Sequence, residues 1–301
     1  MNEVRIVERI RQLAAASAER SSIVRGIGDD CAVIRPKANQ DFVFTTDFVL
    51  EGRHFTLDTH KAADVGHKAL ARSLSDLAAM GSEPVFCLVS LAVPAELAGV
   101  WVNTFYKGLL ALALSFNVAL AGGDLASFDK VIVDVMCCGI VPRGKAILRS
   151  GAKPGDLIYV TGALGGSAAG LRLGRGPLFR RHIRPRPLVK EGTVLRRAGV
   201  SAAIDLSDGL SLDLHRLCVE SRVGADLDHV PVARGATVED ALNGGEDYEL
   251  LFTAPPKKKI PLRVTRIGTI TPGAPGVVLL NGKRLQAKGF DHFASRQHRK
   301  S

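Results

Sequence analysis

The sequence predicts a two-domain protein of the α+β class, in which both halves mix helices and strands (mixed α/β). Its 301 residues are enough for two domains of ordinary size, and 46% apolar with 23% charged residues is typical of a folded globular protein. Predicted strands and helices alternate in both halves without a strict parallel β-α-β rhythm. The pattern restarts at the Gly- and Pro-containing turn "SGAKPGD" (150–156), so we predict domains at 1–147 and 148–301.

The first half combines helical and strand patterns. Helical spacing of apolar residues predicts helices over 1–16 and 58–81, and a long helical region within 94–124 that runs into a short strand and a glycine turn. Short runs rich in Val, Ile, Phe and Thr predict strands at 30–36, 41–50, 84–94 and 130–144.

The second half begins with a strand in "DLIYVTG" (156–162) and a helix over 165–174. A Pro- and Arg-rich connection follows. We then expect a turn and a helix within 201–230, a turn and a strand within 244–255, and short strands at 263–270 and 276–285.

Charge and cysteine content limit the class of protein. The net charge is +10, concentrated in the Arg-rich segment 171–197, in 255–263 and in the tail. A nucleic-acid-binding protein is one explanation, but aromatic residues are only 5% and no helix-turn-helix or zinc knuckle is present. A solvated basic loop, or attraction for small polyphosphates, is favoured. The sequence shows no signal peptide and no apolar run long enough to span a bilayer, and its five cysteines form no C-x-x-C pair. We therefore predict a cytoplasmic protein without a membrane partner.

Aspartates recur beside glycine or hydroxyl residues where predicted elements begin or end. Taken singly, most are explained by the preference of aspartate for caps, turns or solvated helix positions. Asp47 is harder to explain, because it stands in a strand otherwise made of Phe and Val. The set comprises Asp29 and Asp30 in "GIGDD", Asp47 in "TTDF", Asp124 in "GGDL", Asp205 and Asp208 in "DLSDG", Asp76 within a predicted helix, and Glu246 and Asp247 in "GGEDYE".

Carboxylates brought together from distant segments repel one another unless cations neutralise them. Mg²⁺ takes carboxylate oxygens together with water and substrate phosphates, and Thr45 and Thr46 can add further oxygens. We therefore expect Mg²⁺ beside Asp30. No standard motif competes for that role: "GALGGS" (162–167) lacks the Lys-Ser/Thr of a Walker A loop, and no Rossmann G-x-G-x-x-G, hydrolase G-x-S-x-G or zinc H-E-x-x-H is present.

Nine motifs in order resemble those of the thiamine-monophosphate kinases, a family of the aminoimidazole ribonucleotide synthetase-like superfamily. They are "GIGDDCAVI", "TTDFVLEGRHF", "SLSDLAAMGSEP", "GGD", "LRSGAKPGD", "VTGALGGSAAGL", "DLSDGL", "GGEDYELLFT" and "GFDHF", spanning about residues 25 to 294. The resemblance implies a homodimer whose N-terminal domains bind ATP and Mg²⁺ and join their sheets, with C-terminal α/β domains that complete the ATP and substrate sites. It also implies direct, Mg²⁺-assisted transfer of a phosphoryl group from ATP to thiamine monophosphate, the last step in making thiamine diphosphate.

The same resemblance implies three sets of site residues. The Mg²⁺ ligands would be Asp30, Thr45, Thr46, Asp47, Asp76, Asp124, Asp205 and Asp208, of which Asp47, Asp76, Asp124 and Asp208 are the expected catalytic residues. ATP would contact Tyr106, Gly123, Asp124, Arg149 and Ser207. Thiamine monophosphate would contact His54, Glu246 and Phe290.

These roles agree with the chemistry of each side chain. The acceptor is itself a phosphate, so several Mg²⁺ ions would relieve its repulsion with ATP. Arg149 offers a planar fork for phosphates, and Phe290 offers a stacking face for a heteroaromatic ring. Phe290 as a packing aromatic and His54 as an ordinary strand-end histidine are the alternative explanations. The sequence does not decide the number of Mg²⁺ ions or whether a monovalent cation takes part.

Two other functions stay open. Another ATP-dependent synthetase of the same superfamily would keep the N-terminal aspartates and differ in the acceptor pocket. A selenophosphate synthetase would carry a reactive Cys or selenocysteine in a glycine-rich loop, whereas Cys31 opens an apolar strand. From a different class, the chain would be a basic nucleic-acid-binding protein with incidental acidic turns.

Overall fold

The computed structural model describes residues 8–14, 23–25, 33–34 and 37–290. They form two compact units. The first contains the described residues up to Leu148 together with 183–199 and 259–262, and the second contains 149–182, 200–258 and the described residues from Arg263 onward.

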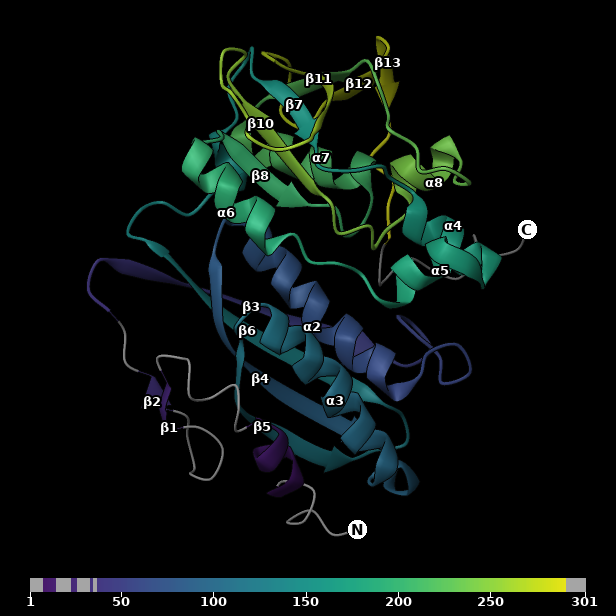
Figure 1. Ribbon diagram of the computed structural model, residues 1–301. Coiled ribbons are helices and arrows are strands. Elements are labelled where there is room, and N and C mark those ends of the chain that lie inside the picture. Colours follow the sequence, from purple (N-terminus) through teal and green to yellow (C-terminus); the bar gives the residue numbers. More distant parts are fainter. Residues whose placement is uncertain (1–7, 15–22, 26–32, 35–36, 291–301) are drawn as a thin grey trace. The chain divides into compact units, whose positions relative to one another are not determined.

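The sheet of the first unit has four strands in the order β3-β6-β4-β5 (Figure 1). They are β3 (Gln40–Leu50), β6 (Ile132–Pro142), β4 (Glu83–Val93) and β5 (Ala119–Ser127). β6 pairs antiparallel with both neighbours, while β4 and β5 are parallel. On β3, exposed Phe44 and Phe48 alternate with the more buried Thr45, Asp47 and Val49. This alternation is typical of an antiparallel strand with one covered face.

Helices α2 (Ala62–Ala79) and α3 (Val100–Ser115) lie side by side over one face of this sheet (Figure 1). They approach closely because each places a glycine against the backbone of the other. A Cβ atom on Gly66 would lie 2.1 Å from the carbonyl oxygen of Phe105, and one on Gly108 would lie 2.0 Å from that of Ala63. Neither position has room for a side chain, so these glycines set the distance between the helices.

A segment from the second half of the chain also belongs to the first unit. Helix α6 (Val189–Ala198) and the residues before it pack on α2 and β4. Arg184 Nε lies 2.5 Å from Asp64 Oδ1, and Arg196 Nη2 lies 2.9 Å from Glu83 Oε1. The sequence-based division at 147/148 did not anticipate this return, because its contacts, these ion pairs among them, join residues more than 100 positions apart.

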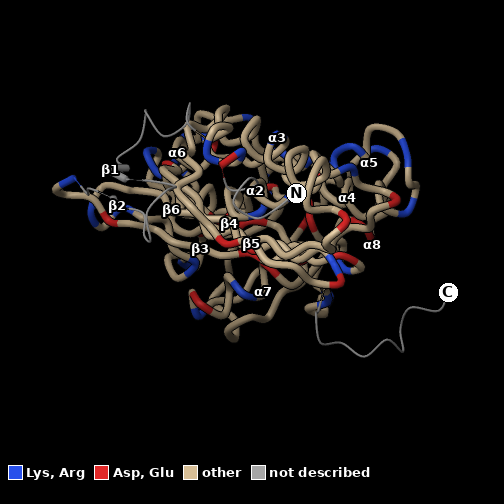
Figure 2. The backbone as a smooth tube through the Cα atoms, turned by 90° about the horizontal axis from the view of Figure 1, so that it is seen from below, with Lys and Arg blue, Asp and Glu red and all other residues tan. Residues whose placement is uncertain are grey.

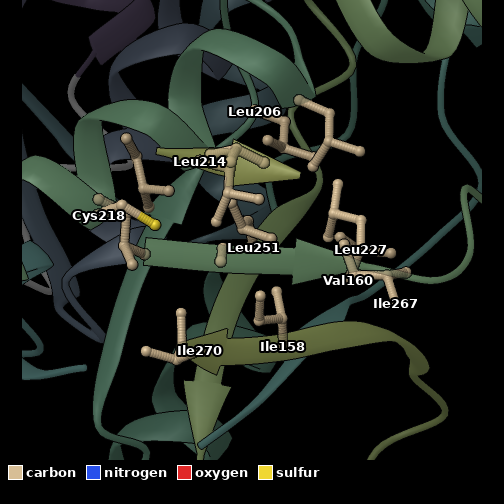
Figure 3. Packing of buried hydrophobic residues seen from close by; sticks show 14 of the residues in the cluster. Ile158, Val160, Leu206, Leu214, Cys218, Leu227, Leu251, Ile267 and Ile270 are labelled. Carbon is tan, nitrogen blue, oxygen red and sulfur yellow. The ribbon is translucent and has the colours of Figure 1, made fainter. Parts of the chain in front are cut away.

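The second unit is built on a seven-stranded sheet in the order β13-β12-β9-β11-β7-β10-β8. Neighbouring strands are antiparallel except β12 and β9. Helix α7 (Leu210–Ser221) packs on the sheet, and Figure 3 shows Leu214 of α7 in the same apolar core as Ile158 and Leu251. The strands are β7 (Leu157–Val160), β8 (Ala202–Asp205), β9 (Gly224–Leu227), β10 (Leu250–Ala254), β11 (Thr265–Thr271), β12 (Val278–Leu280) and β13 (Lys283–Leu285).

The mixed class predicted from the sequence is confirmed, and most predicted elements are present. Residues 8–14 are helical, within the predicted helix 1–16. Strands β8 and β9, and the helices of the Pro/Arg-rich connection, were not predicted. The remaining elements are β1 (Ile23–Arg25), β2 (Val33–Ile34), the short 3₁₀ turns η1 (Ala95–Leu97) and η2 (Arg149–Gly151), and helices α4 (Gly166–Leu173), α5 (Gly176–Ile183) and α8 (Val238–Asn243).

Two further features bear on the sequence predictions. Cys87, Cys137, Cys138 and Cys218 are free thiols and buried, as expected of small core residues. Among the described residues, no helix has both the length and the apolar content needed to cross a bilayer.

Candidate active site

In the first unit, two side chains of β3 meet two residues of α2 that are one helical turn apart. Thr45 Oγ1 donates a hydrogen bond to Asp76 Oδ2. The carboxylate of Asp47 lies 3.6 Å from Arg72 Nη2. Burial raises the pKa of the Asp47 carboxyl above its ordinary value, and attraction to Arg72 opposes that shift. Three predicted Mg²⁺ ligands therefore lie at one contact between strand and helix.

Thr46 points to the opposite face of β3, as the period of a strand requires. Its hydroxyl donates a hydrogen bond to Asp134 Oδ1 at 2.5 Å. The sequence analysis missed Asp134, which lies near enough to Asp47 for repulsion between the two carboxylates to contribute to the raised pKa of Asp47. An aspartate inside "VIVDVM" carries the same signal that singled out Asp47, a charged residue in an apolar strand.

Asp124 lies on β5 and is exposed. The pairing register places it in one row with Ser90 of β4, Asp134 of β6 and Phe48 of β3. Residues in one such row share a face of the sheet, so Asp124 lies with Asp134, on the side away from α2. Asp47 and Asp76 are on the α2 side. Within this unit, then, the structure divides the expected catalytic aspartates between the two faces of the sheet.

The two first-unit residues expected at ATP have different surroundings. Gly123 has a φ of 153°, and a Cβ there would lie 1.9 Å from the carbonyl oxygen of Val89, so only glycine fits. Tyr106 is 3% exposed and packs edge-on against Phe105. Burial raises the pKa of its phenol far above the ordinary value. In this structure Tyr106 is a core residue, and its contact with ATP stays a prediction.

His54, expected at the acceptor substrate, lies just after β3 and is 6% exposed. Its Nδ1 accepts a hydrogen bond from the Leu50 backbone N–H at 2.9 Å. Its carbonyl oxygen accepts one from Lys68 Nζ, also at 2.9 Å, and Lys68 is fully buried in α2. The turn that carries His54 is thus tied to both β3 and α2.

In the second unit, the loop between β8 and α7 is shaped by one carboxylate. Asp213 Oδ2 accepts hydrogen bonds from the backbone N–H groups of Ser207, Asp208 and Gly209 at 2.9–3.1 Å. Burial raises the pKa of Asp213 to about 6, although these hydrogen bonds favour its charged form. Asp205 ends β8 at 3% exposure. The predicted site residues 205, 207 and 208 are therefore presented by a loop of fixed shape.

The substrate residues predicted for the second unit come to this same loop. The Glu246 backbone N–H donates to the Ser207 carbonyl oxygen at 2.8 Å, and that of Phe290 donates to the Asp208 carbonyl oxygen at 3.1 Å. Two segments much further along the chain, at Glu246 and Phe290, are thus joined to "DLSDG" by backbone hydrogen bonds. The structure brings together Ser207, Asp208, Glu246 and Phe290.

Arg149 lies elsewhere in the second unit. Its carbonyl oxygen accepts a hydrogen bond from Ser221 Oγ at 2.6 Å, at the C-terminal end of α7. Ser207 and Asp208 precede the N-terminal end of that helix, and twelve residues of helix span roughly 18 Å. Arg149 is exposed, and its contact with the ATP phosphates stays a prediction.

The phosphate-like turn "GALGGS" has its amides occupied by the protein itself. Asp247 accepts hydrogen bonds from the backbone N–H of Gly165 at 2.5 Å and of Ser167 at 3.0 Å. A buried carboxylate therefore takes the place that a phosphate would take at the start of α4. This agrees with the absence of a Walker A sequence.

The residues of the first unit fit Mg²⁺ in chemistry. Thr45, Asp47 and Asp76 offer only oxygen donors, which hard divalent cations prefer. A cation would also offset the cost of burying the Asp47 charge, which is the main cause of its raised pKa. Within the described ranges, no three His, Cys, Asp or Glu side chains are close enough to hold a metal ion by themselves, so water and substrate phosphates would complete the coordination. Asp30 lies outside the described residues.

The Arg-rich segment 171–197 is largely paired with carboxylates. Lys and Arg colour much of α5 and the neighbouring chain (blue in Figure 2). Five of these arginines lie within 3 Å of an acidic side chain, which reduces the charge available to a nucleic acid. The pairs are Arg172–Asp240, Arg181–Glu249, Arg184–Asp64, Arg186–Glu191 and Arg196–Glu83.

Comparison with known proteins identifies the family of this chain. Residues 28–141 match the family model for the AIR synthase related protein, N-terminal domain. The chain is 38% identical to the thiamine-monophosphate kinase of Buchnera aphidicola over 90% of this chain and 93% of that protein. It is also 38% identical to that of Salmonella typhimurium over 92% and 94% of the two chains. The chain belongs to the thiamine-monophosphate kinase family.

Solved structures of the family show the same fold. The thiamine-monophosphate kinase of Stenotrophomonas maltophilia K279a superposes with a TM-score of 0.83 at 36% identity, covering 95% of this chain and 98% of that one. AaThiL, complexed with AMPPCP and TMP, has a TM-score of 0.80 at 29% identity and covers 97% of both chains. The predicted family and its two-domain architecture are therefore confirmed.

Proposed function

We propose that this chain transfers the γ-phosphoryl group of ATP to the phosphate of thiamine monophosphate, which gives thiamine diphosphate and ADP. The observation that carries the proposal is identity of 38% over nine-tenths of the chain to kinases named for this reaction. A structural neighbour that covers 97% of the chain was solved with AMPPCP and TMP. The cytoplasmic location predicted from the sequence is part of this proposal.

The reaction needs positioning and charge neutralisation more than covalent chemistry. An oxygen of the acceptor phosphate forms a bond to the γ-phosphorus of ATP, while the bond from that phosphorus to the β–γ bridging oxygen breaks and ADP leaves. No enzyme-bound phosphoryl intermediate is required. Mg²⁺ ions bound by Asp47 and Asp76 of the first unit, and Mg²⁺ bound by Asp208 of the second, would supply positive charge to the two polyanions.

The second unit supplies the acceptor side in this proposal. Thiamine carries a permanently cationic thiazolium ring, to which a carboxylate and an aromatic face are both complementary. Glu246 and Phe290 offer these two groups, and their backbones are joined to the loop of Ser207 and Asp208. The same loop thus serves the acceptor and the expected metal ligand.

The homodimer implied by the resemblance is also part of the proposal. β3 is an edge strand of its sheet, and it exposes 37% of Phe42, 60% of Phe44 and 57% of Phe48. Large apolar side chains in a row on an edge strand favour association with a second protein surface. Light scattering on the wild-type protein and on Phe44→Glu tests this. The variant should shift toward monomer, and equal molar masses for the two proteins would contradict the idea.

The kinase reaction is tested with purified protein, ATP, Mg²⁺ and thiamine monophosphate. We expect equimolar thiamine diphosphate and ADP, and no product from thiamine, which lacks the acceptor phosphate. ATP turnover that depends on a different acceptor would favour a synthetase of the superfamily. Binding to duplex DNA that weakens steeply with salt, without kinase activity, would favour the nucleic-acid alternative.

A further inference from the structure

The loop 244–249 of the second unit has an unusual backbone. Glu246 has a φ of 65° and Tyr248 a φ of 52°, the left-handed region that side-chain-bearing residues seldom occupy. Their backbone N–H groups donate to the carbonyl oxygens of Ser207 at 2.8 Å and Leu206 at 2.9 Å. Two such residues so close together persist only where the surrounding contacts hold them.

Helix α5 supplies side-chain contacts to this loop from two adjacent residues. His182 Nδ1 lies 3.3 Å from Glu246 Oε2 and 2.9 Å from Ser167 Oγ. His182 is 3% exposed, so this contact is shielded from water. Arg181 Nη2 lies 2.9 Å from Glu249 Oε1. These contacts fix one side of the loop.

Asp247, between those two loop residues, is held from two directions. Arg181 Nη2 lies 3.7 Å from its Oδ1, and the amides at the start of α4 donate to both of its oxygens. Thr161 Oγ1 donates to Glu249 Oε2 at 2.6 Å. The carboxylates of residues 246, 247 and 249 thus all have partners, and α5 contacts every one of them.

We propose that Arg181 and His182 are positioning residues for the acceptor substrate, which hold the loop 244–249 so that the Glu246 carboxylate is oriented before thiamine monophosphate binds. The inference rests on the proposed function. It gives helix α5, which belongs to the Arg-rich segment, a role in binding the acceptor substrate. Holding a binding group in its bound orientation removes the entropy cost of ordering it when the ligand arrives. Loss of either contact should therefore weaken binding of the acceptor and leave ATP binding unchanged.

Paired substitutions at the two positions test this. His182→Leu removes the contact to Glu246, whereas His182→Asn keeps a polar group near the Nδ1 position. Arg181→Met removes the charge with similar volume, whereas Arg181→Lys keeps it. We expect the Leu and Met variants to raise both the KM and the calorimetric Kd for thiamine monophosphate by about tenfold, and the Asn and Lys variants to recover most of that loss. The KM for ATP should stay within about twofold.

Arg172→Met is the matched control. Arg172 belongs to the same Arg-rich segment and loses an ion pair of 2.6 Å to Asp240, but it does not contact the loop. Its KM for thiamine monophosphate should equal that of the wild type. If His182→Leu does not fold, Arg181→Met alone tests the inference. The Arg181 side chain is 29% exposed, so we expect this variant to fold.

Two results would overturn the inference. One is a KM for thiamine monophosphate within twofold of wild type in folded His182→Leu and Arg181→Met proteins. The other is an equal rise in KM for both substrates with no recovery in the conservative variants, which would mark a purely structural role. Wild-type protein without kinase activity would instead defeat the proposed function.

Discussion

The guanidinium of Arg216 lies 2.6 Å from the carboxylate of Asp208, the second-unit residue expected to bind Mg²⁺ as a catalytic ligand. The same guanidinium lies 2.9 Å from Asp213, whose carboxylate shapes the loop that carries Asp208. Arg216 thus neutralises Asp208 from within the chain. A metal ion and a guanidinium compete for one carboxylate, so Arg216 should control how readily Asp208 accepts the ion.

Arg216→Gln should lower the Mg²⁺ concentration needed for half-maximal activity. Loss of a positive charge beside the ligand favours cation binding, by roughly threefold or more for a partly exposed pair. Glutamine keeps a hydrogen-bond donor for Asp213. A Mg²⁺ titration of turnover, with calorimetric Mg²⁺ binding in the presence of substrates, measures the change. Arg222→Gln, an exposed charge at the far end of α7, is the control, and a higher Mg²⁺ requirement in Arg216→Gln would contradict the idea.

Asp47→Asn should lower Mg²⁺-dependent turnover by about 100-fold or more, while the protein stays folded. The substitution keeps the shape of the side chain and removes a charge whose burial is unfavourable, so thermal stability should not fall. Asp41→Asn is the control on the same strand, since Asp41 is exposed and its side chain accepts a hydrogen bond from the Gly144 N–H at 2.7 Å. Turnover within a few-fold of wild type in Asp47→Asn would show that this carboxylate is not a metal ligand.

Long elements with a clear apolar pattern were predictable from sequence, whereas some of the short ones were not. Helix α2 has a continuous stripe of buried leucines, and the strand that became β6 is a run of Val, Ile and Cys. By contrast, β8 is four residues long and fully buried, so its sequence shows no alternation. Helix α6 has many charged and small residues, and its contacts in the first unit, such as Gly192 against Ala78 and Arg196 with Glu83, join residues far apart in the sequence.

The candidate site was predictable in its residue types but not in its arrangement. Family motifs predicted Asp47, Asp76 and Asp208 as metal ligands, a role that stays a prediction, and the structure holds each in a specific polar contact. Asp134 was missed because no motif contains it, although it contacts Thr46. The position of Asp124 on the other face of the sheet follows from strand register, which a single sequence does not reveal.

His67 makes the stability of the packing of residues 183–199 on α2 depend on pH. Its Nε2 lies 2.9 Å from the Pro185 carbonyl oxygen, and burial lowers its pKa below the ordinary 6.5. The unfolded chain therefore takes up a proton at a higher pH than the folded protein does. The stability contributed at this position is complete above about pH 6.5 and is lost as pH falls through the folded-state pKa.

His67→Gln isolates this effect, because glutamine can donate to Pro185 and does not titrate. We expect the urea midpoint of the wild type to fall more between pH 7.5 and pH 5.5 than that of His67→Gln. Comparing the two proteins cancels the contribution of all other titrating groups. Equal falls in both proteins would show that His67 takes up its proton as readily in the folded protein as in the unfolded chain.

Gly108→Ala tests whether the close contact of α2 and α3 sets the shape of the first unit. A methyl group at this position would lie 2.0 Å from the Ala63 carbonyl oxygen, and the obstructing atoms are helix backbone, which does not rotate away. The helices must separate, so we expect a loss of about 2 kcal/mol or more in the free energy of unfolding. Ala111→Ser, on the exposed side of the same helix, should change the free energy of unfolding by less than about 0.5 kcal/mol.

Because α2 carries Arg72 and Asp76 against β3, the separation of the helices should also raise the Mg²⁺ requirement of Gly108→Ala. Unchanged stability would mean that the two helices do not depend on this contact to pack over the sheet.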